Sequence, residues 1–576
     1  MPDLMITDQL ARWRRQRTAP LILELDLTEG IGEGPPADPV SAVLSMRRAR
    51  VADLLDGLRR ARSDQRVRAL VAKVGGRPIG LATVQEIRRA VEEFRDAGKL
   101  TVAWAETFGE FSAGNVPYYL ATAFDTVYLQ PSGDLGLTGI AMERLFLRGA
   151  LDHLGVDVQV AKRHEYKSAA EQLTERSFSG PAREATQRLA ESVIGQLAEA
   201  ISERRRIEPA EVRKLIDRGP FLAEQAREAG LVDELGYRDE VYARVRKQAG
   251  PETVLMQLGR YQRSRALAER ARRLPNPRQR HVAVIYATGP IRRGRSGRGL
   301  LSGGAMGSDT ISAALRAAAD DDSARAIVLR VNSPGGSYVA SDTIWREVVR
   351  ARNAGKPVVV SMGDVAASGG YYISMGADAI VAQPGTVTGS IGVLSGKPVL
   401  GELLGRAGVT TDSVTEGAHS GMFATTRPFS EEEWALVNDW LDHIYADFTG
   451  KVASGRRMSA ERVHDLARGR VWTGADALAH GLVDEIGGLD RAAAIARRRA
   501  ALPVAAPLRV YPRAAPLDRL RPLSSGSAAL LPAALPGGAS LPALLAEAWG
   551  PVWRLAGQAG LPPYGPLILP GHWSFE

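Results

Sequence analysis

The sequence predicts an α/β fold that occurs twice in tandem, each time as a mostly parallel sheet with flanking helices. One observation is an internal repeat: residues 118–131 align without a gap on residues 371–384, an offset of 371 minus 118, or 253. The other is that short apolar runs alternate with helical patterns in both halves, which is typical of crossover units on a parallel sheet. A chain of 576 residues is too long for one hydrophobic core, so the repeat predicts two domains.

In the first half, each expected strand is a short apolar run and each expected helix has apolar residues at helical spacing. The second strand ends at Gly75 and Gly76, and the second helix is closed by Gly98. We expect strands at residues 21–27, 69–74 and 101–104 and helices at residues 40–62 and 81–97.

The second half repeats this order of elements. We expect strands at residues 282–286, 326–331 and 358–361 and helices at residues 310–319 and 341–354. Each half then finishes, after a helical stretch, on a nearly identical phrase at residues 230–236 and 481–487. The two halves are therefore expected to be versions of one fold.

These landmarks divide the chain into four parts. The expected parts are a first repeat at residues 19–250, a basic linker helix at 251–280, a second repeat at 281–500 and a tail rich in Pro, Ala and Leu at 501–576. The glycine- and arginine-rich segment 292–307 is expected to be an irregular loop. The tail is expected to be a loosely ordered extension, with an interfacial membrane contact near residues 541–555 as the less favoured alternative.

Composition excludes several classes of function. The chain has no cysteine, so disulfides, thiolate metal sites and a cysteine nucleophile are ruled out. Its eight histidines show no metal-ligand spacing, and its net charge of +9 is spread over many arginines without the pattern of a nucleic-acid module. With no signal peptide or transmembrane segment found, we expect a cytoplasmic protein; a peripheral contact with the inner membrane face stays open.

Ser368 is the candidate nucleophile. It stands in a tight Ala-Ser-Gly-Gly turn between an expected strand and an expected helix, and the following backbone N–H groups lie at the positive end of that helix. Gly369 and Gly370 would let a substrate backbone approach closely. The alternative is a helix N-cap serine in a glycine-rich turn.

A second glycine turn would lie beside this serine. Gly335 and Gly336 follow the expected strand at residues 326–331, at the carboxyl end where crossover sheets bind their ligands. Their amide N–H groups, together with that of Gly369, could hold a developing oxyanion. We therefore expect Gly335, Gly336 and Gly369 to form the oxyanion and substrate-binding part of the site.

Four motifs, in this order along the chain, resemble the signature set of the signal peptide peptidase A family, also called protease IV, in its long duplicated form. They are residues 165–169, 331–336, 363–371 and 388–392, within a similarity that runs over about residues 20–495. The resemblance implies a serine peptidase with a Ser/Lys dyad on a crotonase-like fold related to the Clp protease. It also implies a bowl-like ring of four chains. Duplicated members usually carry an N-terminal membrane anchor, and none was found here.

The resemblance further implies that Lys167 is the general base and that Ser390 orients its amine. A lysine can take a proton from a serine hydroxyl only when the amine is neutral, which requires a buried, apolar site. On sequence alone, Lys167 would be one of many surface lysines and Ser390 could cap a turn.

Each repeat has only one of the two candidate catalytic residues Ser368 and Lys167. Asn115 stands opposite Ser368, and Ala418 stands opposite Lys167 when the Phe-Ser pairs of the two repeats are aligned. One complete site would therefore need both repeats. We expect the carboxyl ends of their sheets to converge and the separated halves to be inactive.

Three other candidates are weaker. His419 with Asp364 suggests a Ser/His/Asp triad, but nothing in the spacing places His419 on Ser368. Residues 396–398 superficially resemble a phosphate loop but lack its earlier glycine and its Ser/Thr, so a nucleotide site is rejected. Ser112 could be a displaced nucleophile, although it lacks the trailing glycines.

The leading hypothesis is a serine endopeptidase that needs no cofactor or metal. It would cleave short apolar peptides, such as cleaved signal peptides, by acylation of Ser368, with the substrate added as a strand along the glycine-lined edge. Two alternatives stay open. One is a crotonase-like acyl-CoA hydratase, which usually needs a catalytic carboxylate; the other is a catalytically silent peptide-binding scaffold.

Overall fold

The computed structural model describes residues 19–34, 49–272, 278–299, 303–512 and 567–568. These residues form two compact units. The first contains the described residues up to Met142 and those of 190–272, and the second contains residues 143–189 and the described residues from Arg278 onward. The segment 143–189 comes from the first sequence repeat but belongs to the second unit.

The first unit is built on a six-stranded sheet in which every neighbouring pair of strands is parallel. Its apolar strands alternate with amphipathic helices, as the sequence pattern indicates. In spatial order the strands are β10 (Glu234–Leu235), β6 (Thr126–Leu129), β5 (Leu100–Ala105), β4 (Val67–Lys73), β1 (Leu21–Asp26) and β11 (Val254–Gln257). Two short pairs lie outside it, β2 (Ile31–Gly32) with β3 (Ala49–Arg50) and β7 (Asp134–Leu135) with β9 (Phe221–Leu222).

Helices connect and cover these strands, and α3 packs against α4. The helices of this unit are α3 (Val51–Ser63), α4 (Leu81–Asp96), α5 (Asn115–Ala121), α9 (Pro209–Arg218), α10 (Ala223–Glu228), α11 (Arg238–Ala249) and α12 (Leu258–Arg272). The long helix α8 (Gly180–Arg205) begins among residues of the second unit and ends in the first.

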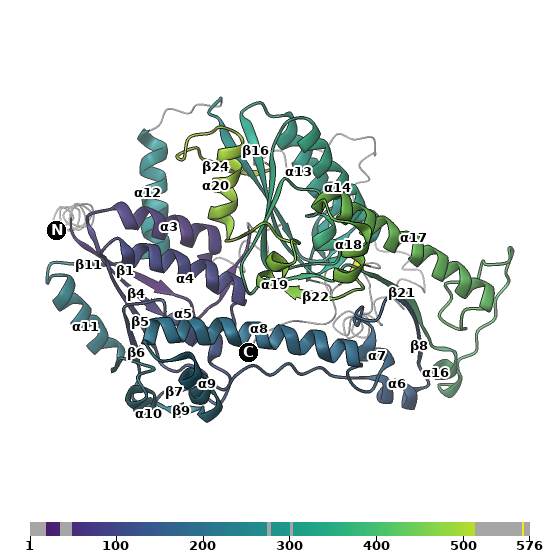
Figure 1. Cartoon of the computed structure of the whole chain (residues 1–576), viewed down its shortest axis with the longest axis horizontal. Helices are drawn as coiled ribbons and strands as arrows, with labels where there is room; N and C mark the ends of the chain where they lie inside the picture. The colour runs from purple at the N-terminus through teal and green to yellow at the C-terminus, as the bar shows by residue number, and fades with distance from the viewer. Residues whose placement is uncertain (1–18, 35–48, 273–277, 300–302, 513–566, 569–576) are drawn as a thin grey trace, which may run out of the picture. The chain divides into compact units, whose positions relative to one another are not determined.

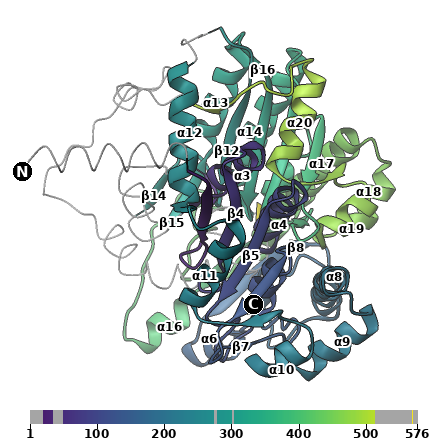
Figure 2. The same ribbon diagram turned by 90° about the vertical axis from the view of Figure 1, so that its left-hand side faces the viewer.

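The second unit is built on an eight-stranded, mostly parallel sheet; only the β20 and β22 pair is antiparallel. The main path runs through β22 (Val471–Thr473), β20 (Val387–Gly389), β18 (Val358–Ala367), β16 (Ala324–Ser333), β12 (His281–Thr288) and β24 (Leu508–Tyr511), and β18 also pairs with β19 (Ala379–Ala382), which pairs with β23 (Glu485–Ile486). Figures 1 and 2 show α13 (Ser308–Asp320) and α14 (Tyr338–Asn353) on one face of this sheet and α20 (Leu489–Arg499) on the other.

Smaller elements surround this sheet. Two further small sheets join β8 (Asp157–Arg163) to β21 (Val393–Val399), and β14 (Gly297–Gly299), β15 (Gly303–Gly307), β13 (Ile291–Arg292), β17 (Gly335–Gly336) and β25 (Leu567–Ile568) in that order. The remaining helices are α6 (Arg148–Leu154), α7 (Glu171–Thr174), α15 (Gly369–Tyr372), α16 (Gly401–Arg406), α17 (Glu431–Arg456), α18 (Ala460–Leu466) and α19 (Gly474–Ala479).

Helix α17 is well specified by its sequence. Ser430 caps it: its hydroxyl accepts the N–H of Glu433, and the Glu433 carboxylate accepts the N–H of Ser430. The apolar residues Val437, Leu441, Ile444 and Phe448 follow at helical spacing and are buried in the core of the second unit. The helix is therefore fixed at its start and along one face.

The predicted α/β fold with parallel sheets is confirmed, and the structure differs from some local expectations. The described residues 297–299 and 303–307 of the segment expected to be an irregular loop form strands, because β14 pairs with β15 and β15 pairs with β13. The tail contributes the edge strand β24 and the short strand β25. The first part of the expected helix at 40–62 and the amphipathic piece at 541–555 lie outside the described residues. Among the residues the structure covers, none of the helices has the length and apolar character to span a bilayer.

Replacement of Leu441 tests the packing of α17. Leu441 is fully buried, so Leu441→Ala leaves a cavity and is expected to lower the free energy of unfolding by about 2–5 kcal/mol. Chemical denaturation followed by near-ultraviolet circular dichroism would measure this. Leu436→Ala, on the exposed side of the same helix, should change it by less than about 0.5 kcal/mol. Equal effects of the two variants would contradict this packing.

Candidate active site

Ser368 directly follows strand β18 and directly precedes the one-turn helix α15. Its N–H donates to the carbonyl of Gly389 at 2.8 Å, and its φ of 54° lies in a region that residues with a side chain rarely adopt. Strain of this kind costs about 1–3 kcal/mol and is found mostly at functional sites. The side chain is fully buried.

Strand register brings Ser390 beside Ser368. Strands β18 and β20 are parallel, and their last residues, Ala367 and Gly389, pair with each other. Ser368 and Ser390 are the residues that directly follow these two strand ends. Ser390 also has a positive φ, of 51°, and its N–H donates to the carbonyl of Arg470 at 2.7 Å. Both serines therefore leave the same sheet at the same level in tight turns.

Lys167, which belongs to the segment 143–189, lies beside the two serines. Strand β8 pairs with β21 in antiparallel register from Arg163 opposite Val393 to Asp157 opposite Val399. The chain then turns, and the Lys167 amine lies 2.9 Å from Ser368 Oγ, 3.0 Å from Ser390 Oγ and 3.1 Å from the Ser390 carbonyl oxygen. The structure thus brings all three predicted side chains together within one chain.

Burial makes this lysine unusual. The side chain of Lys167 is fully enclosed, and its polar contacts among the described residues are two hydroxyls and one carbonyl, none of them an anion. Burial therefore lowers the pKa of the Lys167 amine to about 7. At neutral pH a large fraction of this amine is uncharged and able to accept a proton.

The predicted glycines adjoin the turn that carries Ser368. A Cβ atom at Gly369 would lie 3.1 Å from the Gly336 nitrogen and 3.1 Å from the Gly335 Cα atom, so the two segments are in contact. A side chain at Gly336 would begin 2.1 Å from the Ile291 carbonyl oxygen, so only glycine fits there. Strand β17 pairs with β13 on one side and with β25 on the other.

The loop of residues 468–470 is a part of the site that the sequence did not reveal. Its backbone carbonyls accept the N–H groups of Tyr166 and Ser390, and a side chain at Gly469 would begin 2.5 Å from the Lys167 backbone nitrogen. The loop thus holds the lysine segment against the serine turn. Its only sequence signal is a glycine between two arginines.

The weaker candidates are not brought to this point. His419 lies exposed in a turn, and no hydrogen bond among the described residues joins it to Ser368. Ser112 lies exposed in a turn of the first unit. Lys397 donates to the carbonyls of Met422 and Ala424, so its amine binds the backbone of this chain. No cluster able to hold a metal ion occurs among the residues described.

Asn115 has a structural role at the position equivalent to Ser368. Its side-chain amide donates to the carbonyl of Gly139 at 2.8 Å, and its oxygen accepts the N–H groups of Thr138 and Gly139 at 3.2 Å. The first repeat therefore uses this position to fix a backbone turn.

The Lys167 amine can be tested through stability. Its folded pKa of about 7 lies below the 10.5 of an ordinary lysine, so between these values the unfolded chain binds a proton that the folded chain does not. The unfolding free energy of the wild type should therefore rise with pH, relative to Lys167→Met, by about 1.4 kcal/mol per unit. Urea unfolding at pH 7.5, 8.5 and 9.5 measures this, and a difference that does not change with pH would contradict a depressed pKa.

Comparison with known proteins shows the family of the chain. A family model described as peptidase family S49 matches residues 93–252 and 350–503. The chloroplastic serine protease SPPA of Arabidopsis thaliana is 32% identical over 449 residues, which cover 77% of this chain and 65% of that protein, under two thirds of its length. Protease 4 of Salmonella typhi is 34% identical over 459 residues, which cover 78% of this chain and 72% of that protein.

Among solved structures, a ClpP1 mutant from Listeria monocytogenes aligns with 36% of this chain and 91% of its own, at 16% identity and a TM-score of 0.23. The family match falls once in each sequence repeat, and the Salmonella protein matches over more than two thirds of its length. The chain therefore belongs to peptidase family S49, and with it to the serine-type peptidases.

Proposed function

We propose that the chain is a serine endopeptidase that degrades cleaved signal peptides and other short apolar peptides by an acyl-enzyme mechanism. The observation that carries the proposal is the 2.9 Å contact between the buried Lys167 amine and Ser368 Oγ. An uncharged amine at that distance is within reach of the hydroxyl proton. Membership of a peptidase family argues against the acyl-CoA hydratase and scaffold alternatives.

In the proposed reaction, Ser368 Oγ attacks the carbonyl carbon of the peptide bond while the neutral Lys167 amine takes its proton. The backbone N–H groups of Gly336 and Gly369 stabilise the negative charge on the carbonyl oxygen. The Lys167 ammonium then gives its proton to the leaving amine, which leaves an ester on Ser368. Water hydrolyses this ester with Lys167 again as the base, and Ser390 holds the amine in place.

Substrate would bind by adding a strand to β17. The edge of this strand accepts an extended segment in antiparallel register, since Gly335 pairs with Ile568 and Gly336 with Leu567 of β25. Main-chain pairing of this kind selects extended peptides and excludes folded ones. A homotetramer, which the family resemblance implies, and a peripheral membrane contact, which the net charge of +9 leaves open, are part of the same proposal.

Labelling with a fluorophosphonate tests the dyad. The wild type should be labelled, Ser368→Ala should not, and Lys167→Met should be labelled about 10²–10⁴ times more slowly because it lacks the base. The exposed lysine variant Lys214→Met serves as the control and should match the wild type.

The wild-type labelling rate should also rise about tenfold per pH unit below 7 and level off above, because only the neutral amine is active. Equal labelling of the wild type and Ser368→Ala would reject the proposal.

Removal of the tail tests the strand-adding edge. A chain that ends at Pro512 keeps β24 but lacks β25, so the edge of β17 is free for substrate. We expect a lower KM for a short apolar peptide, by about three- to tenfold, with kcat unchanged. A synthetic peptide of residues 564–571 should then inhibit the truncated chain competitively. An unchanged KM together with no inhibition would argue against substrate pairing at β17.

A further inference from the structure

The turn of residues 368–372, which carries the proposed nucleophile Ser368, is linked to helix α17 through Tyr372. This residue lies one helical turn after Ser368, and its N–H donates to the Ser368 carbonyl at 2.8 Å. Its buried hydroxyl donates to Asp447 Oδ2 at 2.6 Å and accepts from Lys451 Nζ at 2.7 Å. One helical turn thus connects Ser368 to the Asp447 carboxylate on α17.

Strand β17, which carries the proposed oxyanion glycine Gly336 and is called the oxyanion strand below, is linked to the same Asp447 oxygen. Tyr338 lies two residues after Gly336 and opens helix α14, which Ser337 caps. The Tyr338 hydroxyl donates to Asp447 Oδ2 at 2.9 Å. One carboxylate oxygen therefore binds a tyrosine from each of the two segments that must come together at the scissile carbonyl.

Lys451 balances the charge of this cluster. Its amine lies 2.9 Å from Asp447 Oδ2 and 2.6 Å from Asp342 Oδ1, and 4.4 Å above the ring of Trp345. Burial acts to raise the pKa of Asp447, but the hydrogen bonds from Lys451, Tyr372 and Tyr338 outweigh it, so the pKa is lowered. Asp447 is therefore an ionised acceptor, whose hydrogen bonds are stronger than those of a neutral group.

Helix α17 also holds the strand that leads to the lysine. The guanidinium of Arg163, at the end of β8, donates to Asp442 at 2.5 Å and 2.9 Å and to the Asn438 carbonyl at 2.6 Å. Lys167 follows Arg163 by four residues. All three parts of the proposed site are thus attached to one helix.

We propose that Asp447 is a positioning residue, which sets the distance between the nucleophile Ser368 and the oxyanion strand β17 through its shared bonds with Tyr372 and Tyr338. The proposal rests on the peptidase function proposed above. Asp447 touches neither the nucleophile nor the oxyanion glycines, so it would act on the rate of acylation and leave the affinity for substrate nearly unchanged. Lys451 keeps the carboxylate charged and in place.

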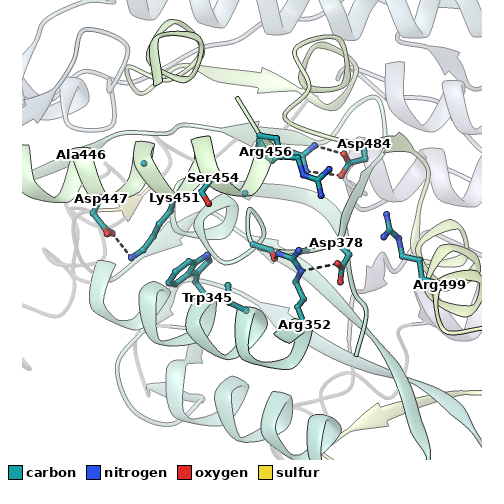
Figure 3. Close-up of a pocket in the computed structure, with 16 residues that line it drawn as sticks. Trp345, Arg352, Asp378, Ala446, Asp447, Lys451, Ser454, Arg456, Asp484 and Arg499 are labelled. Atoms are coloured by element: carbon teal, nitrogen blue, oxygen red, sulfur yellow. Dashed lines mark hydrogen bonds and ion pairs between the residues drawn. The ribbon is translucent and has the colours of Figure 1, made fainter. Parts of the chain in front are cut away.

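Asp447 lies at the edge of a hollow in the second unit. Asp447, Lys451 and Trp345 line a hollow of about 860 Å³ (Figure 3). Its other ion pairs are Arg352 with Asp378 and Arg456 with Asp484. Asp447 lines this hollow, and asparagine has nearly the same shape, so Asp447→Asn leaves no cavity in the core. We therefore expect Asp447 variants to fold.

The experiment compares Asp447→Asn, Tyr338→Phe and Tyr372→Phe by peptide hydrolysis and fluorophosphonate labelling. Asp447→Asn should lower kcat and the labelling rate about 10- to 100-fold, with KM changed less than about threefold. The double variant Asp447→Asn with Tyr372→Phe should be hardly slower than Asp447→Asn alone, because both remove one shared contact. Asp439→Asn, an exposed acid on the same helix, serves as the matched control and should keep the wild-type kcat.

Two outcomes would overturn the positioning role. One is a wild-type kcat and labelling rate in Asp447→Asn; the other is a loss that is fully recovered at a lower temperature where the variant is as stable as the wild type. Labelling of wild type but not of Ser368→Ala shows in the same series that the peptidase proposal holds. A failure of the Asp447 role is therefore distinguishable from a failure of the function itself.

Discussion

The hydrogen bond between the Lys167 amine and Ser368 Oγ is the interaction on which the rest of the site depends. A neutral amine has two N–H donors and one lone pair. The charged amine donates to Ser368 Oγ, Ser390 Oγ and the Ser390 carbonyl oxygen. The carbonyl can only accept, so in the neutral amine the lone pair faces a serine hydroxyl, and at Ser368 it can take the hydroxyl proton. A carboxylate in place of either serine would hold the amine charged and remove that lone pair. The absence of an anion from the contacts of Lys167 is therefore as important as the groups that are present.

The geometry of the dyad follows from two backbone registers. Pairing of β18 with β20 sets Ser368 beside Ser390, and pairing of β8 with β21 carries the segment of Lys167 to the same place. Because side chains alternate between the faces of a strand, a shift of one residue in either register would turn one partner away. The positive φ of both serines is the strain that accompanies this arrangement.

Much of the fold could be predicted from the sequence, because buried parallel strands are continuous apolar runs and the helices have apolar residues at a period of 3.6. The strands within residues 291–307 could not, because glycine and arginine give no alternating pattern. Ser368 stood out by its turn, whereas Lys167 and Ser390 were assigned through a family resemblance. Lys167 in particular looks like a surface residue until the pairing of β8 with β21 encloses it. Asp447 gave no signal, because its tyrosine partners are 75 and 109 residues away in the chain.

Duplication explains why the lysine and the serine come from different repeats. In the second repeat, Ser368 holds its place through its own backbone, with its N–H bonded to Gly389, so its side chain is free for chemistry. In the first, the Asn115 side chain itself supplies the bonds to residues 138 and 139 that fix the turn. A side chain that supports a turn cannot also be a nucleophile, and the first repeat contributes instead the segment 143–189, which packs within the second compact unit. The second compact unit thus combines the serine of one repeat with the lysine of the other, 2.9 Å apart.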